Sequence, residues 1–386
     1  MPATVPTETA GTAILLATLQ NLDTPYFLAS VVHTAATLTK HKLTIVLFSR
    51  FFNVQHQGLT YSETLAVSHT ARSSWNDVQK LLTYVYVQAT KTAQEMGKVL
   101  MDIDILLKGL NDDHLEADLE SLVSELGVEV VFRISGDSIA TPLPPSIGAL
   151  RTAYLPAGGH PLSSGSYSML SQPTSETTTP VLSRTATAKS GDDVTLSSIV
   201  EQPPFYPVVA LGGTFDHLHP GHKILLSMGA WIASEKLIVG VTSSNLLTKK
   251  PNAHLVEPLE VRMQNVRDFL NRFKKGLELY IVELNDVYGP TGWDPNVQAL
   301  VVSRETISGA KEIATHRAAK DFPPLELFVI DVISATNHNL DHEDAGWLKD
   351  MKLSSTFIRA WIAERDAKEE GKLEEAESPS VEGEKN

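Results

Sequence analysis

Polar side chains gather around two adjacent glycines in the segment ALGGTFDHLHPGHKILL, residues 210–226. Gly212 and Gly213 follow an apolar run that predicts a buried strand, and glycines allow the backbone to turn sharply and to approach a ligand closely. Thr214 adds a hydroxyl directly after them. Taken alone, the two glycines are equally consistent with a plain turn between a strand and a helix. The residues that follow decide between these interpretations.

The second half of this segment places two histidines at the predicted start of a helix. Pro220 fits the first helical position, because its missing N–H is not needed there. His219 and His222 therefore lie where free backbone N–H groups and the helix dipole favour an anion. For Asp216 we expect a structural role, since an aspartate in a tight turn readily accepts bonds from backbone N–H groups. The pattern as a whole predicts phosphate binding at the turn.

The longer frame GTFDxxHxGH narrows the kind of phosphate chemistry. Neither GxxxxGK[ST] nor GxGxxG occurs at this turn, which excludes the P-loop and dinucleotide fingerprints here. The frame resembles the signature of the nucleotidyltransferase superfamily that is related to class I aminoacyl-tRNA synthetases. His217 stands where bacterial members of the superfamily have proline, so the geometry of the first turn is expected to differ from theirs.

A second segment, KLSSTFIR at residues 352–359, resembles the superfamily's ISSTxxR signature, with leucine in place of the usual isoleucine. Ser354 can cap a helix, while Ser355 and Thr356 offer hydroxyls and early backbone N–H groups to phosphate oxygens. Arg359 adds a fixed charge for pyrophosphate. A serine cap beside a surface arginine would explain this segment in isolation. Two signatures in the superfamily's order favour a nucleotide site instead.

The segments between the two signatures indicate the substrate through a closer resemblance. Lys249 and Lys250 precede Pro251, and Lys249 resembles the phosphate-binding lysine of phosphopantetheine adenylyltransferases. The later segment NDVYGPTGWDPNVQALVVSRET resembles the same domain of eukaryotic CoA synthases. This resemblance implies transfer of the adenylyl group of ATP to 4′-phosphopantetheine, giving dephospho-CoA and pyrophosphate. Because no kinase P-loop follows, as it does in bifunctional CoA synthases, the reaction is expected to stop at dephospho-CoA.

The resemblance also implies a role for each matching residue. Catalytic roles fall to Thr214 and Lys249, which would hold the acceptor phosphate, and to His222, which would act on the transition-state oxygens. The residues expected to bind the nucleotide are Gly212, Gly213, Phe215, His219, Ser354, Ser355, Thr356 and Arg359. Mg²⁺ is expected to accompany ATP, mostly through phosphate oxygens and water. No protein metal site is predicted.

Two further segments carry polar residues with weaker indications. Arg304 is only a candidate nucleotide ligand, because SRETISGAKE matches the arginine-rich segment of bacterial members poorly. His338 and His342 have a metal-like spacing with Glu343 beside them, but the segment has no clear helix to align the two rings. We expect it to be a loop leading to the second signature.

Composition and pattern divide the chain into four parts. Residues 1–160 contain short apolar runs between stretches with helical spacing, which predicts an α/β region of unknown role. Residues 161–204, half of which are Ser, Thr or Pro, are expected to be a disordered linker. Residues 205–363 alternate strands with amphipathic helices, which predicts a Rossmann-like parallel sheet and the nucleotidyltransferase domain. Residues 364–386 are expected to form a disordered acidic tail.

The overall composition limits the classes of partner. The net charge of −14 makes a broad basic footprint for nucleic acid unexpected. The chain has no cysteine, which excludes disulfides, thiolate nucleophiles and zinc–thiolate sites. No apolar run approaches the roughly 20 residues of a membrane helix, and the first basic residue is Lys40. We therefore expect a cytoplasmic protein without membrane contact, and protein partners, where the chain has them, would use the N-terminal region or the linker.

Three other functions stay open at the level of the sequence. The nearest is another transferase of the superfamily, which uses CTP or a nicotinamide-mononucleotide acceptor. The second is a nucleotide-binding protein without turnover, although a site that has lost its activity has no need of both signatures. The third is an assembly protein whose main role lies in the N-terminal half.

Overall fold

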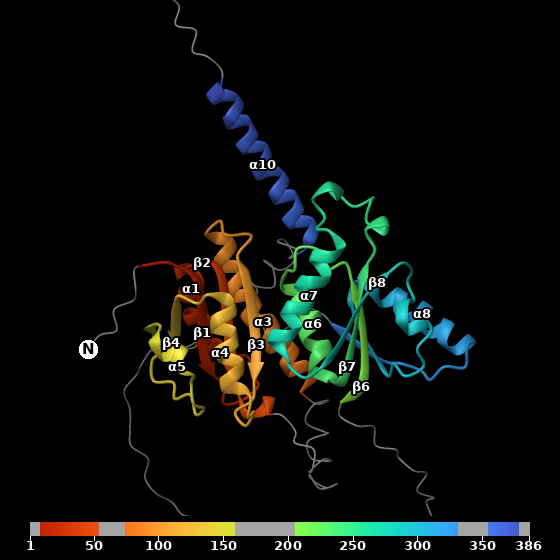
Figure 1. Ribbon diagram of the computed structural model, residues 1–386, viewed down its shortest axis with the longest axis horizontal. Helices are drawn as coiled ribbons and strands as arrows, with labels where there is room; N and C mark the ends of the chain where they lie inside the picture. Colours follow the sequence, from red (N-terminus) through yellow and green to blue (C-terminus); the bar gives the residue numbers. More distant parts are fainter. Residues whose placement is uncertain (1–7, 54–73, 159–204, 331–353, 378–386) are drawn as a thin grey trace, which may run out of the picture.

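The computed structural model describes residues 8–53, 74–158, 205–330 and 354–377, which form two parallel sheets with their helices (Figure 1). This confirms the predicted α/β class and the Rossmann-like parallel sheet in the C-terminal half. The linker predicted at residues 161–204 lies outside the described residues, as do His338, His342 and Glu343.

The N-terminal sheet has the strand order β3-β2-β1-β4-β5, and all of its neighbours pair in parallel. Its strands are β1 (Ala10–Thr18), β2 (Thr39–Phe48), β3 (Asp102–Lys108), β4 (Val130–Ile134) and β5 (Arg151–Leu155). The helices of this half are α1 (Ala29–Leu38), α3 (Trp75–Glu95), α4 (Leu115–Leu126) and α5 (Pro145–Ala149). The central strand β1, with the sequence AGTAILLAT, is almost continuously apolar and mostly buried, as expected for a parallel strand whose two faces are covered by helices.

The C-terminal sheet has the order β10-β9-β6-β7-β8 and is also parallel throughout. Its strands are β6 (Tyr206–Gly213), β7 (Ala233–Thr242), β8 (Glu278–Leu284), β9 (Ala299–Ser303) and β10 (Glu326–Ile330). Its helices are α6 (Pro220–Ile232), α7 (Leu259–Phe273), α8 (Ile307–Ala319) and α10 (Ser355–Glu377). The strand order reverses between β6 and β9, and ligands of open α/β sheets bind outside the carboxyl ends of the strands at such a point. The glycine pair lies at the carboxyl end of β6.

Short 3-10 turns complete the described chain. They are η1 (Tyr26–Leu28), η2 (Arg50–Phe52), η4 (Ser244–Leu246), η5 (Ala253–Leu255), η6 (Gly289–Gly292) and η7 (Arg304–Thr306).

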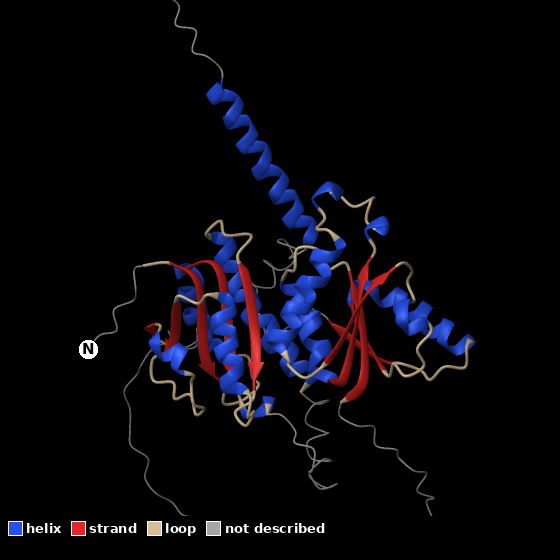
Figure 2. Ribbon diagram, viewed as in Figure 1, coloured by secondary structure: helices blue, strands red, loops and turns tan. Residues whose placement is uncertain are grey.

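The two halves share one hydrophobic core rather than meeting at a polar surface. Helices α3 and α6 pack against each other between the two sheets (Figure 2). Aromatic pairs join the halves as well, with ring centroids 5.8 Å apart for Phe52 and Trp231 and 4.7 Å apart for Trp75 and Phe328. Contacts of this kind hold the N-terminal half directly against the helix that follows the glycine pair.

The end of the chain differs from the sequence-based expectation. Helix α10 continues to Glu377 and extends away from the body of the molecule (Figure 1), so the prediction of a disordered tail from residue 364 is wrong for residues 364–377. Alanine, lysine and glutamate dominate this stretch, and all three are strong helix formers. Among the described helices, none is both long and apolar enough to span a membrane.

Candidate functional site

The chain makes a strained turn between β6 and α6. Phe215 and His217 have φ angles of 51° and 44°, a left-handed conformation that is unusual for residues other than glycine. Glu257 holds the turn by accepting the His217 backbone N–H at 2.6 Å, and the His217 ring contacts the Leu255 carbonyl at 2.8 Å. Backbone strain of this kind persists where surrounding contacts fix the conformation, and it is concentrated at functional sites.

Phe215 lies in the core beneath this turn. Its side chain is fully buried and its ring centroid lies 5.2 Å from that of His222. A Cβ atom on Gly213 would come within 3.1 Å of the Phe215 ring, so a larger residue at this position would fit only if the ring moved slightly. The side chain of Phe215 therefore packs against His222, and the contact of this residue with the nucleotide stays a prediction.

The two histidines stack at the N-terminus of α6. His219 is the residue before the first helical position, and its ring centroid lies 3.8 Å from that of His222 with 27° between the planes. Both rings are half-buried, and the Nδ1 atom of each is buried without a hydrogen-bond partner. Burial, together with the charge of Lys223, lowers the pKa of His219 to about 3. Burial and the neighbouring His219 also hold the pKa of His222 well below its ordinary value, so both rings are neutral at pH 7.

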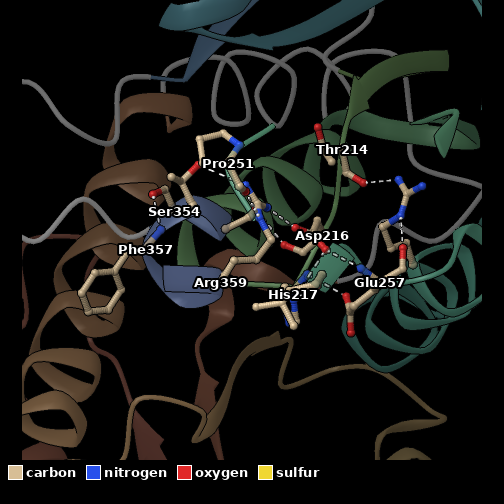
Figure 3. A network of polar contacts seen from close by, with 12 residues as sticks. Thr214, Asp216, His217, Pro251, Glu257, Ser354, Phe357 and Arg359 are labelled. Atoms are coloured by element: carbon tan, nitrogen blue, oxygen red, sulfur yellow. Dashed lines mark hydrogen bonds and ion pairs between the residues drawn. The ribbon is translucent and has the colours of Figure 1, made fainter. Parts of the chain in front are cut away.

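The second signature lies against the first (Figure 3). Ser354 caps α10 by accepting the Phe357 N–H at 3.3 Å, as the sequence predicts. Ser355 donates its hydroxyl to the Asp216 carbonyl at 2.8 Å. The hydroxyl of Thr356 lies on an exposed residue in the first turn. Segments that are about 140 residues apart in the sequence thus form one face at the carboxyl end of β6.

Arg359 connects three parts of this face. Its guanidinium forms a buried ion pair with Asp216, and it donates from Nε to the Pro251 carbonyl at 3.0 Å and from Nη2 to Thr356 at 3.3 Å. The side chain is 1% exposed. In this arrangement its charge neutralises Asp216, and its role in binding pyrophosphate stays a prediction. Asp216 also accepts the Glu257 N–H at 2.9 Å, which agrees with the structural role expected for it.

A buried arginine that the sequence analysis missed supports Thr214. Arg262 donates to the carbonyls of Thr214 at 2.7 Å and Thr242 at 2.8 Å, and it therefore ties together the ends of β6 and β7. It is fully buried and lies on the same face of α7 as Val266 and Phe273. The sequence does contain a signal for this role, because Arg262 stands on the otherwise apolar face of the predicted helix, and a buried charge needs polar partners.

Lys249 and Lys250 lie in an exposed turn after β7. The backbone N–H of Lys250 donates to the Leu247 carbonyl at 3.0 Å, and Pro251 is bound to Arg359 as described. The charge of Lys250 is one of the causes that lower the pKa of His222. Lys250 therefore lies close enough to His222 to act on that ring electrostatically.

Comparison with known proteins matches the same part of the chain. Residues 210–360 match the family described as Cytidylyltransferase-like. The phosphopantetheine adenylyltransferase of Pyrobaculum aerophilum is 34% identical over 161 residues, which are 42% of this chain and 95% of that protein. The chain belongs to the phosphopantetheine adenylyltransferase family.

Two other members of the family give the extent of the likeness. The phosphopantetheine adenylyltransferase of Methanothermobacter thermautotrophicus is 38% identical over 130 residues, 34% of this chain and 76% of that protein. The phosphopantetheine adenylyltransferase of Saccharomyces cerevisiae is 45% identical over 154 residues, 40% of this chain and 48% of that protein. The chain therefore matches about half the length of the yeast relative.

The described residues were also compared with the side-chain groups that bind metal ions in proteins. Within the parts of the chain that the structure describes, no group of three or more histidine, aspartate or glutamate side chains could hold a metal ion. Arg304 lies exposed at the carboxyl end of β9, next to β6, and it stays a candidate nucleotide ligand.

Acidification is expected to destabilise the fold of this family member through its histidine pair. The pKa of His219 is about 3 in the folded chain, whereas an unfolded histidine titrates near 6.5. The unfolded state therefore binds more protons between these values, so the stabilisation is complete above about pH 6.5 and is lost as the pH falls towards 3. Urea midpoints of the wild type and His219→Gln between pH 7.5 and 4.5 test this. The variant should lose less stability over the range, and equal losses would contradict the assignment.

Proposed function

We propose that the chain transfers the adenylyl group of ATP to 4′-phosphopantetheine, releasing pyrophosphate and forming dephospho-CoA. The observation that supports this most directly is the pair of stacked, neutral imidazoles at the N-terminus of α6, together with the serine-capped start of α10, which is bound to the turn before α6 through Ser355 and Asp216. Helix N-termini favour phosphate, and two of them lie together at the strand-order reversal of the sheet. Residues 205–363 are the domain to which we assign the reaction.

The reaction requires alignment more than covalent help from the protein. An oxygen of the acceptor phosphate attacks the α-phosphorus of ATP, and the bond from that phosphorus to the oxygen bridging to the β-phosphorus breaks. The pyrophosphate leaves with the bonding electrons. Charge accumulates on the oxygens around the α-phosphorus, so donors that are already in place lower the barrier. Mg²⁺ enters with ATP as part of the substrate, because the triphosphate supplies the oxygen ligands that Mg²⁺ prefers.

The described residues have distinct parts in this step. The backbone N–H groups at the start of α6 and the neutral ring of His222 serve as donors to the oxygens on the α-phosphorus. His219 lies beside the other phosphates of ATP, and Thr356 offers an exposed hydroxyl to them. Thr214 and Lys249 hold the acceptor phosphate. Arg359 acts indirectly, because its ion pair with Asp216 fixes α10 against the turn.

The proposal is tested by incubating the full chain with MgATP and single acceptors while pyrophosphate and the adenylylated product are measured. We expect 4′-phosphopantetheine to be adenylylated and pantetheine, which lacks the phosphate, to be inactive. Nicotinamide mononucleotide, and CTP in place of ATP, test the other transferases of the superfamily. Nucleotide binding without pyrophosphate release from any acceptor would instead support a binding protein.

The two lysines provide a sharper test of the acceptor. A lost charge-assisted contact to phosphate costs about 1.5–3 kcal/mol, so Lys249→Ala is expected to lower kcat/KM for 4′-phosphopantetheine by about 10- to 100-fold. Lys250→Ala should change it less, and the affinity for MgATP, measured by calorimetry, should change little in either variant. A larger loss of kcat/KM in Lys250→Ala than in Lys249→Ala would assign the acceptor phosphate to Lys250, whose charge acts on His222. Weakened ATP binding by Lys249→Ala would favour another nucleotidyltransferase.

The cytoplasmic location and the use of the N-terminal half or the linker by protein partners remain part of this proposal. Fractionation of cells that express the tagged chain tests the location. Partner capture by the full chain, compared with a chain that lacks residues 161–204, tests the linker.

A further inference from the structure

The side chain of Lys223, the residue after His222, donates its hydrogen bonds to the other half of the chain. The Lys223 ammonium has three hydrogens, and strand β3 supplies an acceptor for each of them: Asp102, the Ile103 carbonyl at 2.8 Å and Asp104 at 2.6 Å. The Lys223 side chain is 3% exposed. A lysine in the first turn of α6 is thus anchored at the beginning of a strand about 120 residues earlier in the sequence.

Two further cations complete a cluster around these carboxylates, of which Asp104 is buried and Asp102 is 43% exposed. Lys42, at the neighbouring position of β2, contacts both Asp102 and Asp104, with 3.1 Å to the latter. Arg272 of α7 contacts Asp104 at 3.2 Å. Burial raises the pKa of Asp104, but the charges of Lys223, Lys42 and Arg272 outweigh this and lower it far below the ordinary range. Asp104 is therefore ionised at every working pH.

A cluster of this kind fixes geometry more than it adds stability. Buried ion pairs contribute little net stabilisation, because desolvation offsets most of their attraction, whereas a missing partner is costly. All three hydrogens of the Lys223 ammonium are already donated to β3, so the first turn of α6 cannot shift without breaking a charged hydrogen bond. The same turn carries His219 and His222.

The cluster also lies beside the proposed site. A cavity of about 390 Å³ is lined by Asp102 and Lys223 of the cluster, by His219, and by Ser354 and Phe357 at the start of α10. Residues of the N-terminal half thus share a cavity wall with both signatures.

We propose that Asp104 is a positioning residue for adenylyl transfer, which acts through Lys223 to hold the first turn of α6 and its two imidazoles in their working places. The N-terminal half is then a structural part of the site. This inference rests on the proposed function, because the expected effect of the positioning is on the rate of adenylyl transfer.

The test compares Asp104→Asn with a matched variant, Asp118→Asn, in the full chain. Asp118 is also a buried aspartate with ion pairs to both halves, to Lys108 at 3.2 Å and to Lys275 at 2.8 Å, and neither of these partners belongs to α6. We expect Asp104→Asn to lower kcat by at least about tenfold with a KM for ATP within about threefold, the signature of an interaction made in the transition state. Asp118→Asn should keep kcat within about twofold even where it lowers the melting temperature.

A double-mutant cycle separates positioning from general loosening. Lys223→Met removes the same link from the other side, so the double variant Asp104→Asn/Lys223→Met should be no slower than the slower single variant, because residues acting as a unit are not additive. Asp104→Glu, which keeps the charge, should recover part of kcat. An unchanged kcat in Asp104→Asn, equal losses in Asp118→Asn, or multiplying losses in the double variant would overturn the inference.

One readout does not depend on the acceptor. The imidazole NMR signals of His219 and His222, assigned with single His→Gln variants, should move in Asp104→Asn and stay in Asp118→Asn. A wild type that releases no pyrophosphate with 4′-phosphopantetheine would contradict the proposed function alone. Histidine signals that do not move in Asp104→Asn would contradict the positioning role.

Discussion

Replacing His222 with alanine is expected to lower kcat by at least about a hundredfold, the loss typical of removing one preorganised oxyanion donor. The ring is neutral, is stacked on His219 and is supported from below by Phe215. It therefore keeps an N–H donor at a fixed place without the reorganisation that a mobile side chain would need. Because the charge on the α-phosphate oxygens grows only during the reaction, the affinity for MgATP should change little.

Steady-state kinetics with MgATP and 4′-phosphopantetheine, together with calorimetry of MgATP alone, test this expectation. His316→Ala is a matched control, because that ring also stacks on an aromatic neighbour in the same domain, with its centroid 4.2 Å from that of Tyr288. It should leave kcat within about twofold. His222→Asn, which retains a side-chain N–H, should be less impaired than His222→Ala. A kcat for His222→Ala near that of the wild type would remove this ring from the mechanism.

The parts of the site that the sequence predicted are those encoded locally. The turn from β6 into α6 and the cap at Ser354 depend on residues within a few positions of one another, so their types and spacing are informative. The order of the strands and the two signatures then indicate that the segments meet, because both follow strand ends of one parallel sheet. This much of the C-terminal half follows from the residues themselves.

The contacts that the sequence did not predict join residues far apart. Lys223 is one polar residue in a predicted amphipathic helix. Nothing near it in the sequence indicates that it binds Asp102 and Asp104 of the other sheet. The sequence predicts that Arg359 binds pyrophosphate. It gives no sign of the ion pair with Asp216, because the two residues are 143 positions apart. Local patterns specify elements, whereas the partner of a buried charge is set by tertiary packing.

Replacing Asp216 with asparagine is expected to destabilise the chain by about 3–5 kcal/mol, because removal of one partner leaves a buried charge without its counter-ion. The charge concerned is that of Arg359, which is 1% exposed. Asparagine keeps the size of the side chain and an oxygen for the Glu257 N–H, so the change isolates the ion pair. Activity should fall with stability, because the same pair holds the start of α10 against the strained turn.

Urea unfolding of the full chain measures the effect, and equal m-values are required before midpoints are converted into free energies. Asp366→Asn is the matched control, since it removes an ion pair to Arg365 on the same helix whose side chains are 41% and 43% exposed. Exposed pairs contribute less than about 1 kcal/mol, so this variant should unfold almost like the wild type. The double variant Asp216→Asn/Arg359→Met should recover much of the loss, because it leaves no unpaired buried charge. A loss for Asp216→Asn as small as that of the control would show that water or another group compensates Arg359, and that the two signatures are held together by other contacts.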